Sequence, residues 1–192
     1  MENKIQPGPD RDFQLELDKL EACGNLRVLP ETCCDGKWIE AGGRRMLNLS
    51  SNDYLGLASD KALREEFLQT VKESDLCFSS SSSRLLTGNF PAYRELETLL
   101  ASLFGAESAL VFSSGYHMNT GILPAVTDAN TLILADKLVH ASLIDGIRLS
   151  AAKCIRYRHQ DYAQLENLLA KYHGSYHRIV IVTESVFSMD GD

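Results

Sequence analysis

The chain has 192 residues, of which 44% are hydrophobic and 23% are charged, and its formal net charge is −7. A chain of this length can form one domain with a sizeable core, and the composition is that of an ordinary globular protein. The negative charge provides no positive field for polyphosphate, which argues against nucleic acid and anionic membranes as partners.

The N-terminal sequence begins polar and becomes amphipathic without a continuous apolar run, which argues against a signal peptide. No later segment approaches the length of a membrane span. The five cysteines are irregularly spaced and include no CxxC pair, so they indicate reduced thiols and neither a disulfide framework nor a zinc site. We therefore expect a cytoplasmic protein.

Short elements are predicted for the N-terminal part of the chain. Apolar residues at helical spacing predict a lead-in helix over 12–23. The stretch 36–57 alternates short apolar runs with Gly-Gly, which predicts two small strands followed by a loop at Ser50–Gly56. We assign residues 1–58 to this N-terminal helix and strand segment.

Two predicted helices flank a run of serines at Ser79–Ser83. Asp60 is suited to cap the start of the first helix. Pro91 is suited to the first turn of the second helix, and Gly105 is suited to end that helix. A polar run of this kind normally indicates a linker. Because it lies between apolar helical patterns and is followed at once by Arg84 and two leucines, we predict an ordered loop instead.

From residue 108 onward apolar strands alternate with helices. The predicted strands cover 108–114, 131–136, 153–157 and 178–184, and the predicted helices cover 116–126, 141–150 and 161–172. This alternation predicts an α/β fold with a mostly parallel sheet covered by helices on both faces. Ligands of such sheets bind at the carboxyl ends of the strands.

The loop after the first of these strands contains Ser113, Ser114, Gly115 and Tyr116. Backbone N–H groups at the start of the following helix favour a phosphate or another anion. A capped helix that binds nothing is the alternative, because serine and glycine are also good caps.

The loops after the second and fourth strands carry further polar residues. His140 is able to stack on a planar ligand or move a proton, although a lone histidine is often structural. Glu184, Ser188, Asp190 and Asp192 follow the fourth strand, and acidic loops of this kind can bind magnesium. No P-loop lysine motif, dinucleotide GxGxxG motif or HExxH metal motif is present.

Five motifs, taken in order, carry a family resemblance: LNLSSNDYLGL, SRLLTGN, LVFSSGYHMN, ADKLVHASLIDG and VTESVFSMDGD. Together they resemble the α-oxoamine synthase family of enzymes that use pyridoxal 5′-phosphate (PLP). The resemblance implies the type I fold of PLP-dependent transferases, with residues 59–192 forming the first half of the PLP-binding large domain. It also implies a homodimer that condenses an amino acid with an acyl thioester and releases carbon dioxide.

The resemblance further implies roles for individual residues. His140 is expected to stack on the pyridine ring and help place the substrate, and Ser188 to bond the phenolic oxygen of the ring. The remaining implied contacts are Ser114, Gly115 and Tyr116 to the cofactor, and Asn52 and Arg27 to the substrate, with Arg27 holding a carboxylate. No metal site is expected. The family is glycine-rich where this chain has serines, so we expect the serine loop to differ in its torsions or to use hydroxyl-to-backbone bonds.

Two family residues have no counterpart in the sequence, namely the Schiff-base lysine and the aspartate that pairs with the pyridine nitrogen. None of the lysines of this chain has the neighbouring residues that surround the Schiff-base lysine in the family. These lysines are Lys4, Lys19, Lys37, Lys61, Lys72, Lys137, Lys153 and Lys171. Two interpretations therefore remain open. The chain is part of a complete acyltransferase, or it is an inactive fragment that acts only in binding, with an exposed sheet edge. The motifs discriminate poorly between the members of the family, and SRLLTGN favours the member that acts in biotin biosynthesis.

Overall fold

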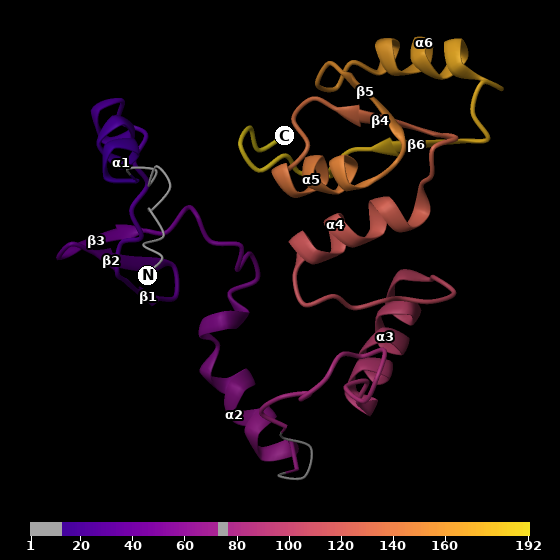
Figure 1. Cartoon of the computed structure of the whole chain (residues 1–192). Helices are drawn as coiled ribbons and strands as arrows, with labels where there is room; N and C mark the ends of the chain where they lie inside the picture. Colours follow the sequence, from indigo (N-terminus) through magenta and orange to yellow (C-terminus); the bar gives the residue numbers. More distant parts are fainter. Residues whose placement is uncertain (1–12, 73–76) are drawn as a thin grey trace, which may run out of the picture. The chain divides into compact units, whose positions relative to one another are not determined.

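The chain divides into two compact units, Met1–Phe78 and Ser79–Asp192. The computed structural model describes residues 13–72 and 77–192 (Figure 1). Among the helices of these residues, none combines the length and the apolar character that a membrane crossing requires. The predicted division into segments 1–58 and 59–192 stays a prediction.

The first unit contains a small antiparallel sheet and two α-helices. Its elements are α1 (Phe13–Ala22), β1 (Thr32–Asp35), β2 (Trp38–Ala41), β3 (Arg44–Leu47), the short 3-10 helix η1 (Leu57–Ser59) and α2 (Lys61–Thr70), with the strands in the order β1-β2-β3. The two predicted strands are confirmed as β2 and β3, which a Gly-Gly turn joins. The strand β1 was not predicted, because all four of its side chains are exposed and it has no apolar alternation.

The predicted helix ends of both units are largely confirmed. Asp60 caps α2, since its side chain accepts a hydrogen bond of 3.0 Å from the backbone N–H of Leu63. In the second unit Pro91 begins α3 (Pro91–Phe104), and Gly105 follows it with a φ of 62°, the left-handed conformation that glycine adopts without strain.

The second unit is built on a parallel sheet in the order β5-β4-β6. Its remaining elements are α4 (Gly115–Val126), β4 (Thr131–Asp136), α5 (Ala141–Leu149), β5 (Lys153–Tyr157), α6 (Tyr162–Tyr172) and β6 (Arg178–Val182). All residues of the central strand β4 are buried. The predicted strands 131–136 and 153–157 are confirmed residue for residue, and the prediction for 178–184 is two residues too long.

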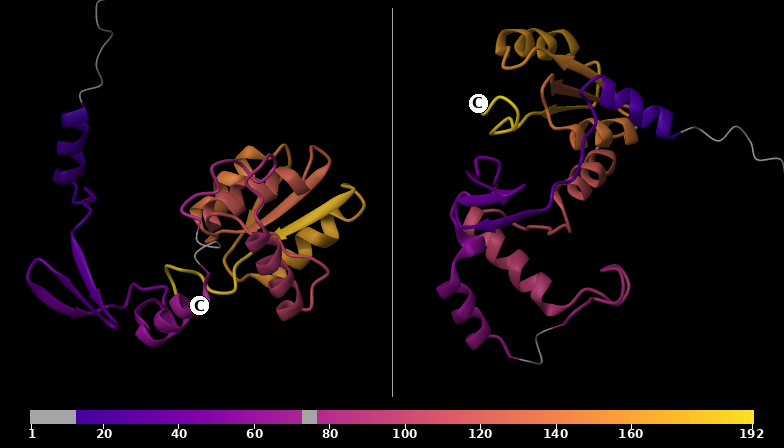
Figure 2. Two further views of the ribbon diagram at one scale, coloured as in Figure 1. Left: turned by 90° about the horizontal axis from the view of Figure 1, so that it is seen from below. Right: turned by 90° about the vertical axis from the view of Figure 1, so that its left-hand side faces the viewer.

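Helices cover the two faces of this sheet, as predicted (Figure 1 and the right-hand view of Figure 2). On one face Ile133 and Ala135 of β4 pack with α4 and α5, through Leu123 and Ile147. On the other face Leu132, Leu134 and Tyr157 pack against residues of α6. Because β4 faces helices on both sides, its sequence is a continuous apolar run.

The strand predicted over 108–114 is wrong, because this segment has no neighbouring strand within residues 77–192. Side chains, and not a neighbouring strand, provide the hydrogen-bond partners of the Val111 backbone. Its N–H donates to Glu97 Oε1 at 2.9 Å, and its carbonyl accepts from Arg84 Nη1 at 3.1 Å. The apolar pattern of the segment therefore reflects an extended chain that an ion pair holds.

The serine run forms an irregular loop with a bend at Ser82, and its own hydroxyl groups stabilise it. Ser80 Oγ donates to the carbonyl of Ser82 at 3.1 Å, and the N–H of Ser81 donates to Ser79 Oγ at 2.9 Å. Ser81 has a φ of 55°, a conformation more typical of glycine. Of the two alternatives expected for a serine loop in a glycine position, the hydroxyl-to-backbone bonds are confirmed, and Ser81 keeps a glycine-like torsion.

Candidate functional site at the carboxyl ends of the strands

The turn that opens α4 presents two free backbone donors. Ser114 caps the helix, because its Oγ accepts from the N–H of His117 at 3.1 Å. Among the described residues no group accepts from the N–H groups of Gly115 and Tyr116, and a side chain added at Gly115 would meet nothing within 4 Å. An anion can therefore reach two unpaired donors at the positive end of the helix dipole.

His140 is the N-cap of α5 and carries an exposed ring. Its Nδ1 accepts from the backbone N–H of Ser142 at 3.2 Å and lies 2.7 Å from Ser142 Oγ. One side of the ring therefore has a structural role, because its Nδ1 caps α5. No described residue forms a hydrogen bond with Nε2, so the other side remains available to a ligand.

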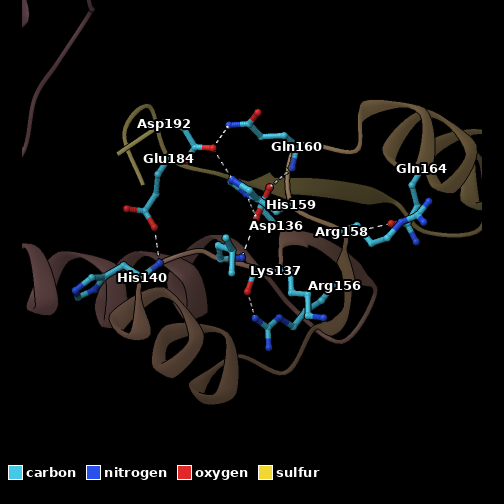
Figure 3. A network of polar contacts seen from close by, with 11 residues as sticks. Asp136, Lys137, His140, Arg156, Arg158, His159, Gln160, Gln164, Glu184 and Asp192 are labelled. Atoms are coloured by element: carbon cyan, nitrogen blue, oxygen red, sulfur yellow. Dashed lines mark hydrogen bonds and ion pairs between the residues drawn. The ribbon is translucent and has the colours of Figure 1, made fainter. Parts of the chain in front are cut away.

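The loop after β6 reaches the start of α5. The N–H of His140 donates to Glu184 Oε1, as the dashed line in Figure 3 shows. This bond joins the loops that follow the second and fourth predicted strands. Residues 13–72 and 77–192 contain no group of three or more His, Cys, Asp or Glu side chains placed to hold a metal. Glu184 thus serves here as an acceptor for the backbone.

A polar cluster links the carboxyl ends of β4 and β5 to the last residues of the chain (Figure 3). The ring of His159 lies between two carboxylates, with Nδ1 3.0 Å from Asp136 Oδ1 and Nε2 3.1 Å from Asp192 Oδ2. Gln160 parallels this arrangement, since its N–H donates to Asp136 and its side-chain amide to Asp192, both at 3.0 Å. His159 also packs edge-on against the buried ring of Phe187.

The carboxylates of this cluster favour the charged form of His159. Hydrogen bonds first to Asp136 and then to Asp192 raise the pKa of His159 above its ordinary value. Burial alone raises the pKa of Asp136, but the N–H groups of Leu138 and Gln160 and the ring of His159 outweigh it, and the net pKa is lowered. This cluster was not predicted from the sequence, although the single Asp136 at the end of the apolar run TLILAD was a signal for it.

Side-chain hydrogen bonds also join α4 to α5. Asn119 Nδ2 donates to Ser142 Oγ at 2.9 Å, and Tyr116 Oη donates to Asp145 Oδ2 at 3.3 Å. The turn that begins with Gly115 and the helix capped by His140 are thereby held to one another.

The predicted site residues fall into three groups. Ser114, Gly115, Tyr116 and His140 lie on the packed pair α4 and α5. Ser188 is exposed in the loop after β6. Hydrogen bonds hold this loop in place, from Glu184 to His140 and from Asp192 to His159. None of the described hydrogen bonds joins Ser188 itself to another predicted site residue. Arg27 and Asn52 belong to the first unit, so their part in the site stays a prediction.

Residues 44–192 match the family model described as aminotransferase class I and II. The chain is 58% identical over 180 residues to a putative 8-amino-7-oxononanoate synthase of Haemophilus influenzae. It is 61% identical over 183 residues to an 8-amino-7-oxononanoate synthase of Haemophilus ducreyi. Each comparison covers 94% of this chain and 47% of the relative, so the chain spans about half the length of these relatives.

Solved structures of related enzymes share the fold. A serine palmitoyltransferase from S. paucimobilis matches with a TM-score of 0.78 and 26% identity, over 94% of this chain and 45% of that one. An 8-amino-7-oxononanoate synthase from Francisella tularensis matches with a TM-score of 0.58 and 32% identity, over 74% of this chain and 38% of that one.

These comparisons confirm the family and the fold predicted from the motifs. The fold is part of the type I fold of PLP-dependent transferases. The predicted cofactor agrees with a neighbouring structure described as a serine palmitoyltransferase with PLP. The chain belongs to the family of class I and II aminotransferases, and its sequence is similar to 8-amino-7-oxononanoate synthases.

Proposed function

We propose that this chain forms part of a PLP-dependent acyltransferase that makes 8-amino-7-oxononanoate in biotin biosynthesis. The reaction joins L-alanine to the acyl carbon of a pimeloyl thioester, either pimeloyl-CoA or a pimeloyl-carrier protein, with loss of carbon dioxide and release of the thiol. The observation that carries the proposal is the identity of 55–61% to relatives that bear this enzyme's name.

The carboxyl edge of the sheet has the groups that a phosphorylated, flat cofactor requires. The free N–H groups of Gly115 and Tyr116 suit a phosphate, and the exposed ring of His140 suits a planar partner. The cofactor would supply the electron sink that stabilises a carbanion next to the amino group.

The residues of this chain would bind and orient the reactants. Ser114, Gly115 and Tyr116 hold the phosphate end, Ser188 donates to the phenolic oxygen, and His140 covers the ring and helps to place the amino acid. Arg27 binds a substrate carboxylate, and Asn52 lies near the substrate. The lysine that binds the cofactor covalently is expected outside these 192 residues, and the active form is expected to be a cytoplasmic homodimer.

Two alternatives predict different outcomes. A sister enzyme, such as 2-amino-3-ketobutyrate ligase, 5-aminolevulinate synthase or serine palmitoyltransferase, would use the same loops with another amino acid and thioester. The solved serine palmitoyltransferases share only 25–27% identity with this chain, which favours the first proposal. A fragment with only a binding role is the second alternative, since β5 and β6 each leave one edge unpaired within residues 77–192.

The proposal is tested by an activity assay of the complete protein, at the length of its relatives. Each of alanine, glycine and serine is combined with each of the pimeloyl, acetyl, succinyl and palmitoyl thioesters. Product mass identifies the pair that reacts. We expect turnover with alanine and the pimeloyl donor. Turnover only with glycine and acetyl-CoA would assign the protein to a sister enzyme. A native subunit near 21 kDa would favour the binding fragment.

A further inference from the structure

The ring of His140 is held from one side by a single residue, Ser142. The backbone N–H of Ser142 donates to His140 Nδ1 at 3.2 Å, and Ser142 Oγ lies 2.7 Å from the same nitrogen. A backbone N–H can only donate, so Nδ1 must be an acceptor and carry no proton. The hydroxyl of Ser142 is then the donor in the shorter contact, and the ring carries its proton on Nε2.

The direction of the Ser142 hydroxyl is set by a second residue. Asn119 Nδ2 on α4 donates to Ser142 Oγ at 2.9 Å, and because this contact occupies the oxygen as an acceptor, it directs the hydroxyl proton toward His140. Ser142 is only 1% exposed, so water does not compete for these bonds. The result is a relay of donors from Asn119 through Ser142 to His140.

The close packing of two helices makes this relay possible. A side-chain carbon at Gly146 on α5 would lie 2.3 Å from the carbonyl oxygen of Asn119. Only glycine permits this approach, and it brings the amide of Asn119 within reach of Ser142. The relay is therefore built into the contact between α4 and α5.

We infer that Ser142, supported by Asn119, is a positioning residue that fixes the orientation of the His140 ring and keeps its proton on Nε2, the nitrogen that faces the ligand site. This inference rests on the proposed function, because it assigns the free side of His140 to the cofactor and substrate. A ring in this state presents one N–H donor and a flat face. Loss of the Ser142 hydroxyl removes one of the two donors to Nδ1 and leaves only the backbone N–H, so the ring turns more easily and a larger fraction carries its proton on Nδ1.

The first measurement needs no cofactor and no turnover. In the complete protein with ¹⁵N-labelled histidine, long-range ¹H–¹⁵N correlation spectra distinguish the two neutral tautomers, and the His140 signal is assigned by its absence in His140→Gln. In Ser142→Ala we expect the ratio of the Nε2–H to the Nδ1–H form to fall about fivefold, the factor that corresponds to one neutral hydrogen bond. Asn119→Ala, which leaves the hydroxyl in place, should shift the ratio in the same direction by less.

The second measurement connects the relay to the site. Titration with PLP and the pH dependence of kcat/KM are compared for the wild type, Ser142→Ala and a matched control, Ser150→Ala. Ser150 lies at the other end of α5, and its Oγ accepts from the N–H of Ala152 at 3.0 Å. We expect weaker PLP binding and a shifted pH profile only in Ser142→Ala, with Ser142→Thr restoring both. The control should change thermal stability alone.

The outcomes separate the inference from the proposed function. An unchanged tautomer ratio in both Ser142→Ala and Asn119→Ala would overturn the relay. A changed ratio with unchanged PLP affinity and pH profile would overturn its role at the site. A wild-type protein that binds no PLP would contradict the proposed function, whereas the tautomer ratio would still decide the relay.

Discussion

The guanidinium of Arg84 pairs with the carboxylate of Glu97 through two hydrogen bonds, of 2.7 and 3.0 Å. The same two side chains bind the carbonyl and the N–H of Val111, and Arg84 also donates to Asn89 at 2.9 Å and lies over the ring of Tyr93. The pair thus replaces the strand neighbour that segment 108–114 lacks. Because Ser113 and Ser114 are the last two residues of this segment, the pair also fixes the approach to the candidate phosphate turn.

Replacement of Arg84 by lysine should loosen this segment. Lysine keeps the positive charge, but its single ammonium group cannot donate to Glu97, Val111 and Asn89 in the planar arrangement of a guanidinium. We expect faster hydrogen exchange in a peptide covering 108–114 and a lower thermal midpoint. The matched control is Arg158→Lys, which alters the ion pair between the exposed Arg158 and the half-buried Asp161. Equal effects of the two substitutions would contradict the account.

A side chain at Gly146 should separate α4 from α5. The added carbon of Gly146→Ala would lie 2.3 Å from the Asn119 carbonyl, so we expect a loss of about 1–3 kcal/mol of unfolding free energy, the usual cost of overpacking. Gly121→Ala in α4 is the control, because its added carbon would meet only Phe112 at 3.7 Å. That change should be neutral or stabilise the helix by up to about 1 kcal/mol. Urea unfolding of both variants measures the difference.

The cluster around His159 should make stability depend on pH. The pKa of His159 is raised above 6.5, so its contribution is complete below this value and is lost as pH rises through the raised pKa. The pKa of Asp136 is lowered below 3.8, so its contribution is complete above that value and is lost as pH falls through the lowered pKa. The cluster is therefore most stabilising between these two ordinary values.

The measurement is the urea midpoint of His159→Gln relative to the wild type. We expect a larger loss at about pH 6 than at about pH 9, because the wild-type imidazolium is neutralised at the higher pH. His173→Gln, at an exposed position after α6, is the control. A loss for His159→Gln that does not vary with pH would show that the ring acts only through packing on Phe187.

Replacement of His140 by alanine tests its proposed role. We expect the complete enzyme to lose turnover by about a hundredfold or more, the range for a residue that orients or moves a proton. Loss of the ring should also change the absorption spectrum of bound PLP. The fold should be retained, because the side chain is exposed and only its contribution as the N-cap of α5 is lost. Unchanged turnover and an unchanged spectrum would show that His140 is structural.

The sequence predicted those features that depend on local pattern. The run TLILAD gave β4 its exact bounds, since a strand covered on both faces must be apolar throughout. Asp60 and Gly105 marked helix ends for reasons of backbone chemistry. Motif order gave the family, which no single loop could have done.

Features that depend on distant partners were missed. The apolar pattern of 108–114 predicts a strand, but pattern alone does not show whether a neighbouring strand exists to accept its hydrogen bonds. His159 lies 23 residues from Asp136 and 33 from Asp192, and only the parallel order of the strands brings them together. The relay from Asn119 to His140 depends on the same long-range packing.

The central claim is that the turn at Gly115 and the ring of His140 bind PLP. A crystal structure of the complete protein with PLP tests it most directly. The account predicts the phosphate at the N–H groups of Gly115 and Tyr116, the pyridine ring against His140, and the phenolic oxygen within hydrogen-bond distance of Ser188. PLP bound with its phosphate at another helix, or its ring away from His140, would contradict the account.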